Sequence, residues 1–195
     1  MSVFTVNAMP ELRTTQIHHT PSITSRIKIE DYTQVSRIGF RGPDVEAFLA
    51  SENLPVPTQP NLSLLDASGI RVVRLSNTEF WLLDETQQNA QRIMDMEVSA
   101  LKGEGIYRLY CQHSHAMFVC VGEDCESMFA KICGVDLSRH AFLVNQLAQT
   151  SVARVNAIVI NAASESQSGR FLVLSDIASS QHLWDALWDA AEEFA

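Results

Sequence analysis

Three residues near the middle of the chain, Cys111, His113 and His115, are of types that bind metals or carry out nucleophilic chemistry. They alternate along the sequence, and alternate side chains of a β-strand share one face at a spacing of roughly 6.6 Å. Cys111 and His115 would then lie about 13 Å apart, whereas zinc bonds its ligands at about 2 Å. A metal site on His113 and His115 therefore needs a third ligand from elsewhere in the chain, such as His140.

A nucleophile at Cys111 needs a neighbouring group that lowers the pKa of its thiol, such as a helix N-terminus, and nothing nearby in the sequence supplies one. Residues 111–129 are therefore interpreted most simply as a strand, a turn and a helix. In that interpretation Cys120 and Cys125 are small core residues, and Cys133 ends the helix just before Gly134.

Other catalytic signatures are missing from the sequence. It contains no phosphate-binding GKS or GKT, no GxSxG and no HExxH. The stretch GEGIYR at 103–108 begins like a dinucleotide-binding loop but lacks the last glycine and follows a predicted helix instead of a strand.

The elements that position these residues occur twice. RIGFRGPDVEAFLASENLP, from Arg37, matches MFVCVGEDCESMFAKICGVD, from Met117, at an offset of 80 positions. Each copy predicts a short strand, a glycine turn and a helix with acidic residues in its first turn. The matched residues are Gly42 with Gly122, Asp44 with Asp124, and Glu46 with Glu126.

The repeat continues beyond the first helix. At the same offset VVRL (72–75) meets VARV (152–155), which pairs Arg74 with Arg154. FWLLDE from Phe80 then resembles FLVLSD from Phe171, with the offset enlarged by 11 in the polar stretch NAASESQSGR. Each half ends in a helix, so we predict an α+β fold built from two strand–helix–hairpin–helix units.

Two further pairs of residues have a structural and a functional interpretation. Arg74 and Arg154 either are structural or solvent-facing, or contact a ligand or partner. Trp184 and Trp188 lie four residues apart, as on the core face of an amphipathic helix, although tryptophan is also enriched at protein interfaces.

Composition narrows the functional classes. The net charge of −9, with 14 basic residues and no basic cluster, disfavours nucleic acid and anionic membranes as partners. No secretory signal or membrane-length apolar run occurs, which favours a cytoplasmic protein with free cysteines. We expect residues 1–35 to form an extended arm, and 36–195 to form one duplicated domain with halves at about 36–110 and 111–195.

The stretches RIGFRGP, HSHAMFVCVG, MFAKICGVDLSRHAF, LAQTSVARVNAIV and LWDALWDA together resemble the gamma subunit of heterotetrameric sarcosine oxidase. The corresponding subunit of N-methylglutamate dehydrogenase looks similar. The resemblance implies the folate-binding fold of the glycine-cleavage aminomethyltransferase, and it implies partners, the larger alpha, beta and delta subunits. Those subunits would hold FAD, FMN, NAD, zinc and tetrahydrofolate. It transfers no catalytic, cofactor-binding or metal-binding residue to this chain.

The resemblance implies an accessory subunit of a complex that oxidatively demethylates sarcosine to glycine and passes the one-carbon unit to tetrahydrofolate. Two rival hypotheses remain. One is a stand-alone folate-binding aminomethyltransferase-like protein, and the other is a small metal-binding module on His113 and His115. The arm carries apolar residues without an evident place in the repeat, which we expect to dock on a partner. These residues are Val3, Phe4, Val6, Met9, Leu12 and Ile17.

Overall fold

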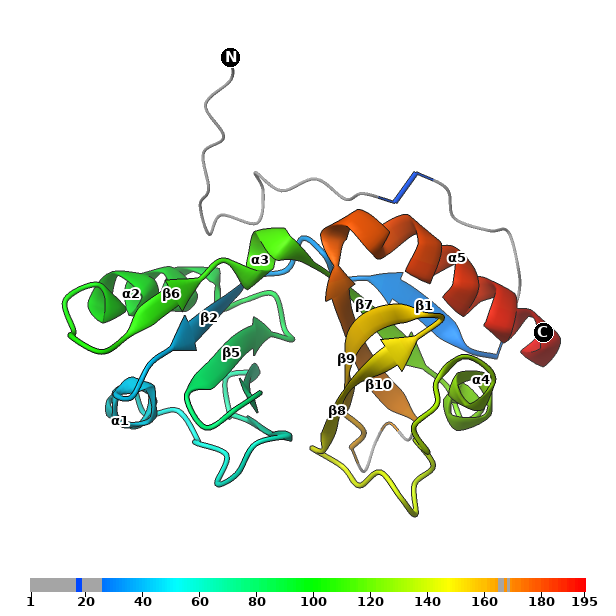
Figure 1. The fold of residues 1–195 in the computed structure, drawn as a ribbon, viewed down its shortest axis with the longest axis horizontal. Coiled ribbons are helices and arrows are strands. Elements are labelled where there is room, and N and C mark those ends of the chain that lie inside the picture. Colours follow the sequence, from blue (N-terminus) through cyan, green and yellow to red (C-terminus); the bar gives the residue numbers. More distant parts are fainter. Residues whose placement is uncertain (1–16, 19–25, 165–166, 168) are drawn as a thin grey trace. The chain divides into compact units, whose positions relative to one another are not determined.

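A computed structural model describes residues 17–18, 26–164, 167 and 169–195 of the chain. The chain has an α+β fold with two five-stranded antiparallel sheets (Figure 1). It divides into two compact units. The first contains Gln34–Ser114, and the second contains His115–Ala195 together with the described residues among 17–33.

The first unit is one sheet with helices inserted between its strands. Its strand order is β3-β4-β5-β2-β6. The strands are β2 (Arg37–Arg41), β3 (Leu62–Leu65), β4 (Ile70–Arg74), β5 (Glu79–Asp84) and β6 (Tyr107–Leu109). The helices are α1 (Val45–Ser51), α2 (Ala90–Ala100) and the short α3 (Cys111–Ser114).

The second unit follows the same plan, with the strand order β1-β7-β10-β9-β8. The strands are β1 (Lys28–Asp31), β7 (His115–Val121), β8 (Leu147–Val152), β9 (Val155–Asn161) and β10 (Arg170–Asp176). The helices are α4 (Cys125–Ile132) and α5 (Ser180–Ala191), with 3-10 turns η2 (Ile177–Ser179) and η3 (Glu192–Phe194).

Each sheet buries alternate residues against the helices of its own unit, as the two-residue period of a strand requires. In the first unit Phe40, Phe80 and Leu82 from the strands share one core with Leu49 of α1 and Ile93 of α2. All five side chains are fully buried. Burial of one such side chain contributes about 1.5–3 kcal/mol, so this face fixes α1 and α2 on the sheet.

The second unit has a larger core of the same kind. Phe118 and Phe171 from the sheet lie in one cluster with Phe129 of α4 and with Leu183 and Trp184 of α5. The rings of Phe129 and Phe171 meet edge to face at 5.2 Å, an arrangement that aromatic pairs favour.

The repeated pattern of the sequence has a counterpart in the strand pairing. Phe40 of β2 pairs with Phe80 of β5, and the matched residue Cys120 of β7 pairs with Phe171 of β10. Gly42 and Gly122 both follow the first strand and have similar backbone angles, with φ of 147° and 153°. These pairings agree with an internal duplication, which stays a prediction.

The predicted match of Arg74 with Arg154 is wrong. Arg74 pairs with Phe80 at the end of β4, and the residue that pairs with Phe171 in the second unit is Asn161. Arg154 lies instead in the two-residue turn between β8 and β9, where it has a φ of 68°. The offset of 80 does not hold there, because the loop before β8 and the strands β8 and β9 are all longer than their counterparts in the first unit.

In each predicted unit, one strand was missing between the first helix and the last helix. Each first helix is followed by three strands instead of a two-stranded hairpin. The additional strands, β3 and β8, lie at the edges of the sheets. Their short, partly polar sequences LSLL and LAQTSV carry a weak strand signal. The helices predicted to close each half are present as α2 and α5.

In each sheet, one edge strand comes from the segment just before the first strand of the other unit. β1 comes before β2 of the first unit but pairs with β7 of the second. β6 comes before β7 of the second unit but pairs with β2 of the first. The structure divides the chain after Ser114, and β1, which the sequence placed in the arm, belongs to the second unit.

Part of the expected arm belongs to the second unit. Ile27 and Ile29 are buried in its core, and the backbone N–H of Arg26 donates to the carbonyl of Phe194 at 2.9 Å. Ile17, another apolar residue of the expected arm, packs against the same cluster. The other apolar residues of the arm, from Val3 to Leu12, lie outside the described residues.

Candidate functional site

The residues that first suggested chemistry do not share a strand face. Cys111 and His113 lie in the helical turn α3, and β7 begins only at His115. The turn forms because the backbone N–H groups of His113 and Ser114 both donate to the carbonyl of Tyr110, at 3.0 and 3.2 Å. The prediction of one strand through this stretch is therefore wrong for residues 111–114.

His140 lies apart from these residues in the sequence, in the exposed loop between α4 and β8. Within the part of the chain that the structure describes, no group of three or more His, Cys, Asp and Glu side chains could hold a metal ion. The described residues therefore offer His113 and His115 no metal centre of this kind.

The cysteines of the second unit are core residues, as the repeat predicted. Cys120 and Cys125 are fully buried, and Cys133 is the C-cap residue of α4. Burial, together with the smaller effect of the carboxylates of Asp124 and Glu126, raises the pKa of the Cys125 thiol to about 12. A thiol with this pKa stays protonated at neutral pH and is a poor nucleophile.

Arg74 has a structural role. Its guanidinium donates to the carbonyl of Pro57 at 2.7 Å and forms an ion pair with Glu46 at 3.1 Å. The guanidinium also lies over the ring of Phe80, 5.0 Å from the ring centre. These contacts tie α1 and the following loop to the sheet, while Arg154 lies exposed in its turn.

Trp184 confirms the core interpretation of the last helix. Its side chain is buried, and its ring lies 5.2 Å from that of Phe118 on β7. Trp188 packs at the edge of the same core and meets Trp184 edge to face at 5.9 Å.

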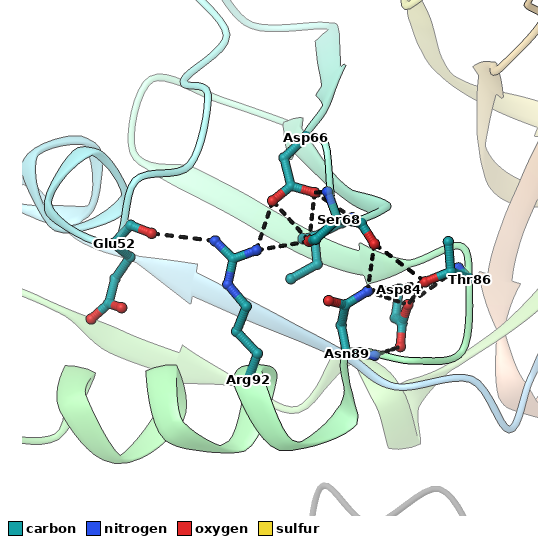
Figure 2. A network of polar contacts seen from close by, with 8 residues as sticks. Glu52, Asp66, Ser68, Asp84, Thr86, Asn89 and Arg92 are labelled. Atoms are coloured by element: carbon teal, nitrogen blue, oxygen red, sulfur yellow. Dashed lines mark hydrogen bonds and ion pairs between the residues drawn. The ribbon is translucent and has the colours of Figure 1, made fainter.

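A dense polar cluster joins the β3–β4 turn to the start of α2 in the first unit (Figure 2). Its centre is the carboxylate of Asp84, which is fully buried at the end of β5. One oxygen accepts the backbone N–H of Asn89 at 2.7 Å, and the other accepts the Asn89 amide at 3.0 Å. The second oxygen also accepts the backbone N–H and the hydroxyl of Thr86, at 3.2 and 3.1 Å.

Asp66 and Arg92 complete the cluster on the turn side. The Asp66 carboxylate accepts the backbone N–H groups of Ser68 and Ile70 and forms an ion pair with Arg92 at 2.7 Å. Arg92 also donates to the carbonyl of Glu52 at 3.4 Å (Figure 2). The carboxylates are occupied by groups of the chain itself, so the cluster fastens the turn to α2 and is not arranged for catalysis.

The same contacts predict a dependence of stability on pH. Burial favours the neutral acid of Asp66, but hydrogen bonds from Ser68, Ile70 and Arg92 outweigh it and hold the pKa of Asp66 below its usual value. A lowered folded-state pKa means that the stabilisation is present above about pH 4 and is lost as the pH falls through the folded pKa.

We therefore expect Asp66→Asn to unfold at lower urea concentration than the wild type near neutral pH. The gap should narrow in acid, where both chains carry a neutral residue at this position. Urea unfolding followed by circular dichroism from pH 7 down to about pH 3 measures it. A gap that stays constant over this range would contradict the assignment of the pKa to these contacts.

A cavity of about 360 Å³ lies on the sheet of the second unit, at one end of β7, β9 and β10. Its polar lining comes from His115, Gln149, Thr150 and Asn156. The described residues that line it include neither a carboxylate nor a thiol, and their polar groups can hold a small polar molecule by hydrogen bonds.

Sequence reasoning missed the cluster around Asp84 and the cavity at His115. DASG at 66–69 is a turn signal that could have revealed the β3–β4 hairpin and with it the place of Asp66. No local pattern marks Asp84 as buried, although its partners Thr86 and Asn89 follow it within five residues.

A scan against models of protein families finds no match, and a search of curated proteins finds no similar sequence. Among solved structures, the fold matches aminomethyltransferase T of the glycine cleavage system from Bartonella henselae, with a TM-score of 0.58 and 16% identity. That match covers 84% of this chain but 45% of the aminomethyltransferase. The chain therefore has an aminomethyltransferase-like fold and spans less than half the length of that enzyme.

A second match extends over nearly all of both chains. It is to a chain of heterotetrameric sarcosine oxidase from Corynebacterium sp. U-96, in a structure with pyrrole 2-carboxylate. It covers 86% of this chain and 85% of the other, with a TM-score of 0.74 and 23% identity. The fold implied by the sequence resemblance is thereby confirmed. No helix among the described residues is long and apolar enough to cross a membrane.

Proposed function

We propose that this chain is the gamma-type accessory subunit of a heterotetrameric sarcosine oxidase, and that it acts in the cytoplasm. The observation that carries the proposal is the structural match to a sarcosine oxidase chain over 86% of this chain and 85% of the other. The family-like sequence stretches, such as KICGVDL and LAQTSVARVNAIV, also support it.

In this proposal the chain contributes structure and the larger subunits contribute the chemistry. The alpha, beta and delta subunits hold FAD, FMN, NAD, zinc and tetrahydrofolate, and the complex oxidises sarcosine to glycine. The cysteines and Arg74 have structural roles in this chain, which supports the proposal that the chemistry takes place on the other subunits. The matched pairings of the two units further support an origin by internal duplication.

Activity of the captured assembly tests the proposal. The full chain is tagged in its native host, and the assembly that it brings down is assayed with sarcosine and with N-methylglutamate. Oxidation of sarcosine supports the proposal. Oxidation of N-methylglutamate alone would replace it with the corresponding subunit of N-methylglutamate dehydrogenase. An assembly that oxidises neither substrate would contradict both.

One observation favours a second candidate, a stand-alone folate-binding protein. The cavity at His115 has a volume of about 360 Å³, which lies in the range of small-molecule sites. Calorimetric titration of the isolated chain with tetrahydrofolate tests it, with Gln149→Leu as a variant of the cavity wall. Binding that the variant weakens would favour this candidate, and the absence of heat would reject it.

A further inference from the structure

The loop between α4 and β8 holds two adjacent aliphatic side chains in solvent. Leu143 is 56% exposed and Val144 is 52% exposed. They line a cavity of about 280 Å³ in the second unit, together with the buried side chains of Phe142 and Phe171. These two rings are stacked, with 5° between their planes. We call Leu143 and Val144 the aliphatic lip.

The backbone that carries the lip is held in place. The Leu143 N–H donates to the side chain of Gln146 at 2.8 Å, and the amide of Asn161 donates to the carbonyl of Phe142 at 2.7 Å. The N–H of Asn145 donates to the carbonyl of Asn161 at 2.8 Å. A fixed loop loses little conformational freedom on binding, so the lip is preorganised for contact.

The charges around the cavity are unequal. Its lining contains the carboxylates of Glu123 and Glu126 and the guanidinium of Arg139. Arg139 is committed to Glu126, through an ion pair at 3.3 Å and a backbone hydrogen bond at 3.0 Å. Glu123 is exposed and has no ion pair among the described residues, which leaves the cavity with one uncompensated negative charge.

We propose that this cavity receives a lysine or arginine side chain from a segment of a larger subunit. The inference rests on the proposed function. Basic side chains bury their aliphatic stems on apolar surface and keep the charged head in a polar environment. The stem would lie along the aliphatic lip, and the head group would reach Glu123. The site thus combines an apolar contact with charge complementarity.

Charge also argues against a second copy of this chain as the occupant. The chain has a net charge of −9, so two copies repel at long range. A basic segment of a different chain has the opposite electrostatics, which raises its rate of association.

The test measures the affinity of the full chain for the purified complex of the remaining subunits by biolayer interferometry. We expect Leu143→Ser with Val144→Ser to weaken binding by about 10- to 100-fold. The matched control is Leu101→Ser with Val98→Ser in the first unit, because these residues are the same types and are 63% and 55% exposed. The control should bind like the wild type.

The charge is tested separately at Glu123. We expect Glu123→Lys to weaken binding by about tenfold. We expect Glu123→Gln to make the binding affinity less dependent on salt concentration. If both Glu123 variants and the lip variant bind like the wild type, the inference is wrong and the proposed function stands. If the wild type itself does not bind the remaining subunits, the proposed function fails and the inference falls with it.

The oligomeric state of the isolated chain completes the test. Light scattering should find a monomer for both the wild type and the lip variant. A wild-type dimer that the lip substitutions dissociate would assign the cavity to a second copy and overturn the proposal. Circular dichroism of each variant checks that it is folded.

Discussion

Replacing Asp84 with alanine is expected to lower the free energy of unfolding by about 3–5 kcal/mol. The side chain is fully buried and accepts four hydrogen bonds from Thr86 and Asn89. Its removal leaves the buried N–H of Asn89 without this acceptor and leaves a gap beside Thr86 and Asn89, just before α2. Urea unfolding at neutral pH measures the loss.

Two matched variants separate the hydrogen bonds from other effects at this position. Asp84→Asn has almost the same shape but turns an amide N–H toward the Asn89 N–H, so we expect a loss of about 1–3 kcal/mol. Asp95→Ala removes an exposed carboxylate from α2 and should change stability by less than about 0.5 kcal/mol. If Asp84→Ala had the same free energy of unfolding as Asp95→Ala, the cluster would have no structural role.

Gly122→Ala is expected to destabilise the second unit by about 2–5 kcal/mol. Gly122 has a φ of 153°, which side-chain-bearing residues rarely adopt. A Cβ at this position would lie 2.7 Å from the carbonyl oxygen of Arg26 and 3.1 Å from the Cα of Ile27. Both atoms belong to the backbone that leads into β1, so relief of the clash requires the edge strand to move.

Gly134→Ala is the control for this substitution. A Cβ at Gly134 would meet nothing within 4 Å, and its backbone conformation is an ordinary one. We expect its free energy of unfolding to lie within about 0.5 kcal/mol of the wild type. Thermal unfolding of the two alanine variants compares them directly, and equal midpoints would show that Gly122 has no special conformational role.

The turn glycines were predictable from the sequence because they sit in a local pattern. Gly42 and Gly122 each separate a short strand from a helix. The spacing of apolar residues in each helix predicts which face is buried. Local signals of this kind also identified Cys120 and Cys125 as core residues. The α+β class followed from the order of such elements, without knowledge of how the strands pair.

The features that sequence reasoning missed depend on contacts between distant segments. β1 became part of the second sheet by pairing with β7, which lies far along the chain. Arg154 was misplaced because the loop before β8 and the strands β8 and β9 are longer than their counterparts, which changes the offset between the repeats. Asp84 carries no local mark of burial, because burial depends on the packing of the whole unit and not on its near neighbours Thr86 and Asn89.

Native mass spectrometry tests most directly whether this chain is part of a larger complex. The tagged full chain is captured from its own host, and the mass and composition of the intact assembly are determined. We expect one assembly that contains this chain, the alpha, beta and delta chains and bound flavin. A chain that emerges alone, or only with copies of itself, would contradict it.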